Sequence, residues 1–359
     1  MGDVYPKIRI AAVQAAPIFL DREATVEKAC GLIREAGAKG ANLVGFPEGF
    51  ISGHPLWYHF HSATCAYSMK LATELFKNSV EIPSQATEAL CQAAREANVH
   101  VVMGLCEHLP GTFGTMYNTQ LFIDDHGRIL GKHQKIVPSA GERLVHTGGY
   151  GDTLRVFQTR FGRISGLLCG ENSNPLAIFA LMAEGTMIHV ASWPSTRHKA
   201  SFGVSDRAES AGRAVAMMSK AFVINAVGTV SHEMIEMLAA NDDDRAFLSD
   251  PNSSGGSTII NPQSDVIAGP LGNEEGILCA DIDLEDCVRA KVIHDLSGHY
   301  NRADIFNVRV NRTAPSLYHS CVTSTDGELI TPAENRHAAE DFPGPAPVAD
   351  PCDVSLNRQ

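Results

Sequence analysis

The strongest constraint on the fold is the alternation of short β-rich apolar runs with amphipathic helical runs along most of the chain. Helical and strand runs alternate near both ends, whereas turns at 124–127 and 160–162 join consecutive strands in the middle. The predicted strands cover 8–14, 42–46, 100–105, 118–123, 129–135, 154–159, 163–169, 187–192, 222–226, 257–260 and 277–282, and the predicted helices cover 22–38, 85–97, 175–184, 207–219 and 284–293. This mixture predicts an α/β fold with a mixed sheet or two sheets rather than a simple doubly wound fold.

Composition and charge exclude several classes of protein. The chain has 359 residues, of which 44% are hydrophobic and 19% charged, which is ordinary for a globular protein. The formal net charge is −12 and no basic cluster occurs, which argues against binding to the phosphates of a nucleic acid. No run approaches the roughly 18 apolar residues of a membrane span. With no signal peptide at the start and nine cysteines without CxxC spacing, we expect a soluble protein of the reducing cytoplasm.

Two segments and a tail interrupt the regular pattern. Residues 52–81 are rich in aromatic residues and histidine, and residues 232–256 are acidic and rich in turn formers, so both are interpreted as insertions on a core. Beyond about Asn311 the periodicity fades and prolines accumulate. We therefore expect one enzyme-sized domain over 1–310 and a partly disordered extension over 311–359.

Three side chains at the ends of predicted strands could carry chemistry. Glu48 follows a buried strand in a turn, where a carboxylate can act as a base, although a solvated loop glutamate is the commoner case. Cys169 ends an apolar strand just before a helix that opens near Pro175, which favours the nucleophilic thiolate, although most such cysteines are structural. Lys135 ends another strand and could stabilise a developing anion, or could simply be solvated at a strand edge.

Other motifs are weaker. The histidines at 54, 59 and 61 lack a carboxylate or cysteine partner at ligand spacing, so no metal site is predicted. The glycine-rich run 148–151 lacks the helix and lysine of a phosphate-binding loop, and no Gly-x-Ser-x-Gly motif occurs. We expect neither a metal nor an organic cofactor.

Taken together and in order, these segments resemble the nitrilase superfamily of carbon–nitrogen hydrolases. The resemblance runs from Ile8 to about Val310 and is carried by five motifs: Ala11-Ala12-Val13-Gln14, Phe46-Pro47-Glu48, Lys135-Ile136-Val137-Pro138 leading to Glu142-Arg143, Leu168-Cys169-Gly170-Glu171-Asn172, and the segment from Gly298 to Asp304. It implies that Glu48, Lys135 and Cys169 form the family's catalytic triad and that Glu142 is its additional active-site glutamate.

The resemblance also implies an architecture and an activity. The expected fold is an α-β-β-α sandwich whose subunits pair through helices at 175–184 and 207–219 and can extend into spiral oligomers. The expected activity is that of a nitrilase, which converts a small-molecule nitrile to a carboxylic acid and ammonia; an amidase, a cyanide-converting enzyme and a non-catalytic binding subunit are the alternatives. The residues expected to bind substrate are Trp57, Tyr58, Gly170, Asn172 and Trp193.

Two positions depart from the family pattern. Gly170 stands where a tryptophan usually follows the nucleophile, and His146 stands where a tryptophan usually follows the Glu-Arg pair. Both changes predict a pocket of altered shape.

Overall fold

The computed structural model describes residues 2–196, 203–315, 322–323 and 329–330. Contacts divide the chain into two units, Met1–Thr313 and Ala314–Gln359. In the second unit, β13 (Val322–Thr323) pairs antiparallel with β14 (Leu329–Ile330). Most of the tail for which disorder is expected therefore lies outside the described residues.

Two six-stranded mixed sheets form the first unit. The first sheet has the order β12-β1-β2-β3-β4-β5, and the second has the order β11-β10-β9-β8-β7-β6. The first contains β1 (Lys7–Gln14), β2 (Leu43–Gly45), β3 (His100–His108), β4 (Met116–Ile123), β5 (Ile129–Gln134) and β12 (Gly276–Asp283). The second contains β6 (Phe157–Gln158), β7 (Arg163–Leu168), β8 (Ile188–Trp193), β9 (Phe222–Val227), β10 (Thr258–Ile260) and β11 (Val266–Ala268).

Each sheet has three parallel strands at its centre and antiparallel strands at its edges. In the first sheet β1, β2 and β3 are parallel, and in the second β7, β8 and β9 are parallel. The carboxyl ends of parallel strands meet at one edge of a sheet, which is where α/β proteins commonly place their ligands. This topology makes the segments that follow β2 and β7 natural positions for a site.

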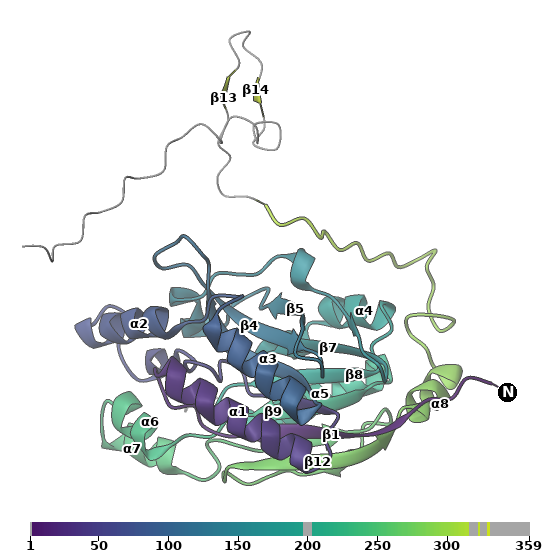
Figure 1. The fold of residues 1–359 in the computed structure, drawn as a ribbon, viewed down its shortest axis with the longest axis horizontal. Coiled ribbons are helices and arrows are strands. Elements are labelled where there is room, and N and C mark those ends of the chain that lie inside the picture. Colours follow the sequence, from purple (N-terminus) through teal and green to yellow (C-terminus); the bar gives the residue numbers. More distant parts are fainter. Residues whose placement is uncertain (1, 197–202, 316–321, 324–328, 331–359) are drawn as a thin grey trace, which may run out of the picture. The chain divides into compact units, whose positions relative to one another are not determined.

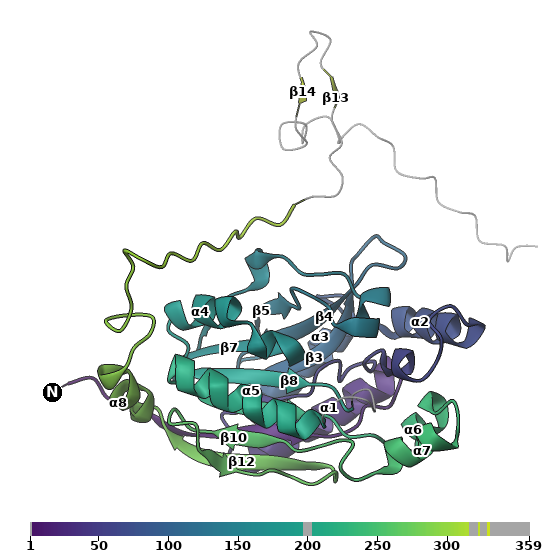
Figure 2. The ribbon, with the colours of Figure 1, turned by 180° about the vertical axis from the view of Figure 1, so that it is seen from behind.

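Helices cover the outer face of each sheet, so the first unit has four layers (Figures 1 and 2). Helices α1 (Arg22–Ala38) and α3 (Gln85–Ala97) pack on the first sheet, and α4 (Pro175–Ala183) and α5 (Val204–Ser219) pack on the second. A third apolar cluster joins the two sheets and includes Ile10, Phe122 and Ile224. The expected α-β-β-α sandwich is confirmed.

The helices begin where the sequence supplies caps. The carboxylate of Asp21 accepts a hydrogen bond from Ala24 N at the start of α1. The side chain of Asn174 caps α4, whose first residue is Pro175. Helix α8 (Glu285–Ile293) also matches its predicted range closely. The short strand β11 was not predicted, because its three residues lie between turn formers at 261–265 and 269–270.

Both interrupting segments contain helices. Residues 52–81 include the 3₁₀ helix η1 (Leu56–His59) and α2 (Ala66–Asn78), and residues 232–256 include α6 (His232–Leu238) and α7 (Asp242–Ser249). Figures 1 and 2 both place α2, α6 and α7 at the same end of the sandwich.

Residues 232–256, interpreted from the sequence as an insertion rich in turn formers, fold into two short helices. The side chains of Ser231 and Asn241 cap α6 and α7, and the aspartates of α7 lie in its first turn, where the helix dipole favours negative charge. Met234, Leu238 and Leu248 are buried in an apolar cluster shared with η1 and α2. No helix within the described residues is long and apolar enough to cross a membrane.

Candidate active site

The three predicted catalytic residues lie immediately after strands of the two facing sheets. Glu48 lies in the turn that follows β2, Lys135 directly follows β5, and Cys169 directly follows β7. All three side chains belong to buried residues. The site is therefore built at the interface between the two sheets, from segments distant in sequence.

Close packing of the backbone fixes the turn that carries Glu48. Glu48 N donates to Trp193 O at 3.1 Å, which ties the turn to β8 of the opposite sheet. A Cβ atom on Gly104 of β3 would lie 2.0 Å from Pro47 O and 3.0 Å from Glu48 Cα. Only a glycine at 104 therefore lets the turn lie this close to β3.

Lys135 is held between two segments. Lys135 N donates to Asn118 O of β4 at 2.8 Å, and Gly149 N donates to Lys135 O at 2.8 Å. A Cβ atom on Gly148 would lie 2.5 Å from Ile136 O, and one on Gly149 would lie 2.4 Å from Gln134 O. The glycine pair thus allows its loop to lie directly against the lysine segment.

Cys169 occupies a strained turn. Its φ of 49° is in the left-handed region, which is uncommon for a residue other than glycine, and it begins the 3₁₀ helix η4 (Cys169–Ser173). Glu171 braces this turn from inside: its carboxylate accepts from Leu168 N at 3.1 Å and from Ile136 N at 2.6 Å. One buried carboxylate thereby joins the residue before the cysteine to the residue after the lysine.

The ammonium of Lys135 lies between two carboxylates. Lys135 Nζ is 2.7 Å from Glu48 Oε1 and 2.6 Å from Glu142 Oε2. The side-chain amide of Asn118 donates to both carboxylates, at 2.6 Å to Glu48 Oε1 and 2.7 Å to Glu142 Oε1. Glu48 Oε2 is buried and has no hydrogen-bond partner within the described part of the chain.

Burial and neighbouring charges give the two carboxylates different pKa values. Burial raises the pKa of Glu48 to about 7, against the opposing effect of Lys135 and with a contribution from Glu142. Burial also opposes ionisation of Glu142, but Lys135 and a hydrogen bond from His146 outweigh it and hold the pKa of Glu142 well below its usual range. Burial alone would lower the pKa of Lys135, yet Glu48, Cys169 and Glu142 raise it. One carboxyl group can therefore exchange a proton near neutral pH beside a permanent ion pair.

Glu142 lies in the short 3₁₀ helix η2 (Ala140–Leu144), and its carboxylate also contacts Ser139 and His146. Ser139 N donates to Glu142 Oε2 at 2.8 Å, and His146 Nδ1 lies 3.3 Å from Glu142 Oε1. His146 Nε2 lies 3.2 Å from the sulfur of Cys106. The histidine at the position of a usual tryptophan is thus a buried polar neighbour of the site.

One group of residues has atoms close enough to hold a cation. Glu48, His54 and Glu142 each offer a ligand atom, and these atoms lie within 4.8 Å of one another. Sequence spacing did not indicate this proximity of His54 to two carboxylates. Because Lys135 Nζ is hydrogen-bonded to both carboxylates, a metal ion there would have to displace a buried ammonium.

Three residues expected to bind substrate are instead buried inside the protein. Asn172 is fully buried, and its amide donates to Leu167 O and Cys169 O while its oxygen meets His189 Nε2 at 2.8 Å. Trp193 is buried, and its indole N–H donates to Asn225 Oδ1 at 3.1 Å. Trp57 is 0% exposed and packs in the cluster around α2 and α6, so it does not present a surface to a partner.

Gly170 and Tyr58 remain compatible with their expected place at the pocket. Gly170 is exposed, and within 4 Å of a Cβ atom built on it the described residues place only Ser139 Oγ, at 3.7 Å. Tyr58 is half-buried, and a Cβ atom on Gly141 would lie 2.6 Å from its Cβ, so it contacts the segment that carries Glu142. Space is therefore available directly beside the cysteine turn.

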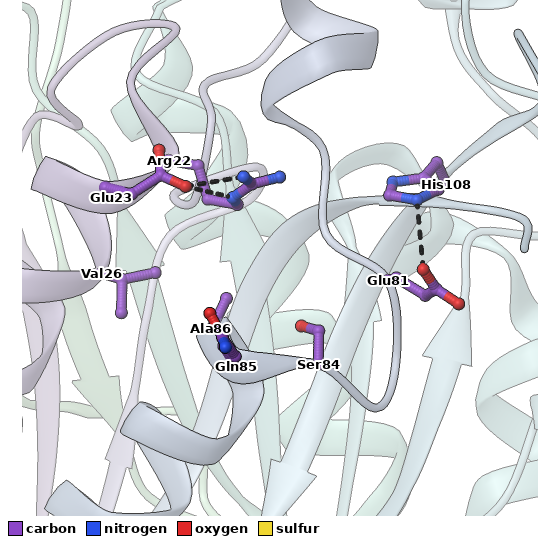
Figure 3. A pocket seen from close by; sticks show the side chains of 8 residues that line it. All are labelled: Arg22, Glu23, Val26, Glu81, Ser84, Gln85, Ala86 and His108. Carbon is purple, nitrogen blue, oxygen red and sulfur yellow. Dashed lines mark hydrogen bonds and ion pairs between the residues drawn. The ribbon is translucent and has the colours of Figure 1, made fainter. Parts of the chain in front are cut away.

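A separate pocket of about 430 Å³ lies between α1, α3 and the end of β3 (Figure 3). Its ionisable side chains lie in pairs: Arg22 with Glu23, and His108 with Glu81. It contains none of the three predicted catalytic residues. Its volume alone does not make this pocket a second candidate for the active site.

A sequence profile described as "Carbon-nitrogen hydrolase" matches residues 9–292. The chain belongs to the carbon–nitrogen hydrolase family. The match covers the turn of Glu48, the segment of Lys135 and the turn of Cys169, and therefore the whole candidate site of this carbon–nitrogen hydrolase.

Similar proteins refine the comparison. The carbon–nitrogen hydrolase is 38% identical to "Nitrilase 2" from an unknown prokaryotic organism, over 87% of this chain and 95% of that one. It is 36% identical to "Aliphatic nitrilase" from Rhodococcus rhodochrous, over 88% of this chain and 86% of that one. A solved structure of Saccharomyces cerevisiae Nit3, titled a member of branch 10 of the nitrilase superfamily, has a TM-score of 0.62 at 19% identity and covers 82% of this chain and 96% of that one. An amidase from Nesterenkonia sp. AN1 has a TM-score of 0.58 at 19% identity, over 80% of this chain and 96% of that one, and both structures show a shared fold only.

Sequence reasoning missed the inner residues of this hydrolase's site. Asn118 and Glu171 were not assigned a role in the site, although each touches a segment or side chain of it. One signal was present for Asn118, because an amide in the interior of a predicted strand needs a hydrogen-bond partner when it is buried. The partners themselves are distant in sequence and could not be identified from the strand pattern.

Proposed function

We propose that this carbon–nitrogen hydrolase is a nitrilase that converts an organic nitrile to the carboxylic acid and ammonia, with Cys169 as nucleophile. The observation that carries the proposal is the buried Lys135 ammonium between Glu48 and Glu142, beside a cysteine in a strained turn. Nitrilases that share 34–38% of the sequence support nitriles as the substrate class.

The first half-reaction uses the unequal roles of the two carboxylates. Glu48 Oε2 accepts the proton of the Cys169 thiol, and the thiolate sulfur adds to the nitrile carbon to form a thioimidate. As the C–N bond order falls, negative charge grows on nitrogen, where the Lys135 ammonium stabilises it. The proton held by Glu48 then passes to this nitrogen. Glu142 stays ionised and fixes Lys135.

The second half-reaction consumes two water molecules in total. Glu48 takes a proton from the first water as it adds to the thioimidate carbon and passes this proton to the nitrogen. The proton of the new hydroxyl group then also reaches the nitrogen through Glu48, ammonia leaves, and a thioester remains on Cys169. A second water, activated in the same way, hydrolyses the thioester and releases the acid and the thiol. A carboxyl group with a pKa of about 7 can accept and return a proton in each step.

We further propose that the substituent on the nitrile occupies the space beside Gly170, with Tyr58 near the wall of the pocket. The absence of a side chain at 170 supports this placement. In this arrangement Asn172 and Trp193 do not touch the substrate but support the cysteine turn and the glutamate turn, respectively. Trp57 packs in the neighbouring apolar core.

Self-association of the protein is also proposed, through α4 and α5. A groove of about 330 Å³ with a nearly all-apolar lining runs along α4 and the segment after α8. Leu176 of α4 is 62% exposed and Phe306 is 66% exposed. Exposed apolar surface of this kind favours burial against a second copy. The tail and the α6–α7 segment are the additions that a larger spiral assembly would use. We also propose that the protein is located in the cytoplasm.

Ammonia release from matched panels of nitriles and amides tests the activity. We expect turnover of at least one nitrile, and a loss of roughly 10³-fold or more in Cys169→Ala. Cys91→Ala, on the outer helix α3, is the matched control and should retain activity. Turnover of amides alone would make the protein an amidase, and activity in Cys169→Ala above about a tenth of wild type would contradict the nucleophile assignment.

A further inference from the structure

Asn118 contacts three of the four residues assigned to the active site. Its carbonyl accepts the backbone N–H of Lys135 at 2.8 Å. Its side-chain nitrogen donates one hydrogen to Glu48 and the other to Glu142, at 2.6 and 2.7 Å. The residue is 0% exposed.

The chemistry of the neighbours fixes the orientation of this amide. Two carboxylate oxygens lie within hydrogen-bond distance of one amide atom, and an ionised carboxylate only accepts hydrogen bonds. A flipped amide would place its own oxygen against both carboxylates. Asn118 Oδ1 is buried and has no partner in the described part of the chain. This orientation therefore leaves one acceptor without a hydrogen bond, while the amide nitrogen donates to both carboxylates.

The contacts also differentiate the two oxygens of Glu48. Oε1 receives hydrogen bonds from both Lys135 Nζ and Asn118 Nδ2, whereas Oε2 is buried without a partner among the described residues. If Asn118 did not hold Oε1, the carboxylate could rotate and offer either oxygen to Lys135.

We propose that Asn118 is a positioning residue that fixes Glu48 and Glu142 on either side of Lys135 and so leaves Glu48 Oε2 as the atom that exchanges the proton of Cys169. This rests on the proposed function, in which Cys169 is the nucleophile and Glu48 its base. Asn118 itself does not touch the substrate in this assignment.

The test uses Asn118→Leu, which keeps the approximate size, and the smaller Asn118→Ala; both remove the two donors without adding a charge. The matched control is Thr119→Val, the next residue of β4, which is also buried and whose hydroxyl donates to Glu107 at 2.8 Å. The full-length variants are compared by circular dichroism, by kcat and KM, and by the pH dependence of Cys169 alkylation with iodoacetamide, followed by peptide mass.

Removal of the two donors should lower kcat by about 10²-fold with KM changed less than about threefold. The inflection of the alkylation profile should move to higher pH by about one unit, because donors that favour ionised Glu48 are lost. The titratable groups that face Glu48, namely Lys135, Glu142, His54, Cys106 and Cys169, are the same in every variant. Thr119→Val should change neither quantity.

An unshifted alkylation profile in either folded Asn118 variant would overturn the proposal, as would equal loss of kcat in Thr119→Val. If Asn118→Leu does not fold, the alkylation profile of Asn118→Ala provides the test. Because alkylation requires no nitrile, the test distinguishes failure of the nitrilase assignment from failure of the positioning role. A wild type without nitrile turnover refutes the nitrilase assignment, while a shifted alkylation profile still supports the positioning role of Asn118.

Discussion

At the scale of single residues, the site depends on charges that the interior would ordinarily exclude. Lys135 is 1% exposed, and a buried ammonium is tolerated only because Glu48 and Glu142 both contact it. Three formal charges in one buried cluster leave a net negative charge when all are ionised. Burial and this repulsion raise the pKa of Glu48, whereas Lys135 and a hydrogen bond from His146 hold the pKa of Glu142 low, so Glu48 is the carboxyl group that holds a proton near neutral pH.

The raised pKa of Glu48 predicts the acid limb of the pH–rate profile. Glu48 must be ionised to accept the thiol proton, so kcat/KM should fall as the pH drops through about 7. An ordinary glutamate would place this limb near its usual pKa of about 4.3. Initial rates in buffers of constant ionic strength measure it, and a flat profile between these two values would exclude Glu48 as the base.

The charge of Lys135 predicts that arginine cannot replace it. A planar guanidinium distributes its charge and cannot fit between two carboxylates that a compact ammonium contacts at 2.7 and 2.6 Å. We expect Lys135→Arg to lose at least about 10²-fold in kcat while its circular dichroism spectrum stays native. A fully active Lys135→Arg enzyme would contradict the anion-stabilising role.

Gly170 predicts substrate size. Gly170→Trp should fill the space beside Cys169 and reduce kcat/KM for bulky aryl nitriles at least about tenfold more than for small aliphatic ones. Gly170→Ala is the control, since its Cβ atom meets only ordinary contact at 3.7 Å among the described residues. An unchanged ratio in Gly170→Trp would remove Gly170 from the substrate pocket.

At the scale of elements, strand ends determine where the catalytic groups lie, and glycines determine how closely the turns approach. Gly104 belongs to the central parallel strand β3, yet its missing side chain is what accommodates the turn of Glu48. Gly148 and Gly149, dismissed as a phosphate loop from the sequence, perform a similar task beside Lys135.

Gly104→Ala should therefore lower both the stability and the activity of the protein. Its Cβ atom would overlap Pro47 O, and relief of the overlap must displace the turn that carries Glu48. We expect a loss of about 1–3 kcal/mol in the free energy of unfolding together with a large fall in kcat. Gly31→Ala in α1, where a Cβ atom meets nothing within 4 Å, is the control and should be neutral or slightly stabilising. Chemical denaturation and initial rates measure both, and an active, stable Gly104→Ala would contradict the close-approach argument.

The sequence could predict most of the elements because their periodicity is local, and it could indicate Glu48, Lys135 and Cys169 as candidates because each follows a predicted strand within a recognisable motif. It could not predict which aromatic and amide side chains face inward. Trp57, Trp193 and Asn172 were expected at the substrate, but their environments are set by α2, β9 and the cysteine turn, which come together only in the folded chain. Helices α6 and α7 were missed because their acidic, turn-forming residues act as caps there.

At the scale of the whole molecule, the sandwich leaves an apolar outer face on one side. The groove along α4 combines exposed Leu176 with Phe179, Met182 and Met218, and its lining carries almost no polar surface. A face of this composition is costly to leave in water, and burial against the same face of a second copy satisfies two-fold symmetry with one set of contacts.

The proposed dimer predicts an effect of charge at α4. Leu176→Asp should lower the molar mass measured by light scattering at micromolar concentration to that of a smaller species, because an unpaired carboxylate would be buried in an apolar interface. Phe113→Asp is the control, since Phe113 is 99% exposed between β3 and β4, on a different part of the surface. If Leu176→Asp associates as the wild type does, the interface lies elsewhere on the protein. A wild type that is monomeric and fully active would contradict the proposed self-association. Because α4 directly follows the η4 turn of Cys169, loss of the interface should also lower kcat, whereas Phe113→Asp should leave it unchanged.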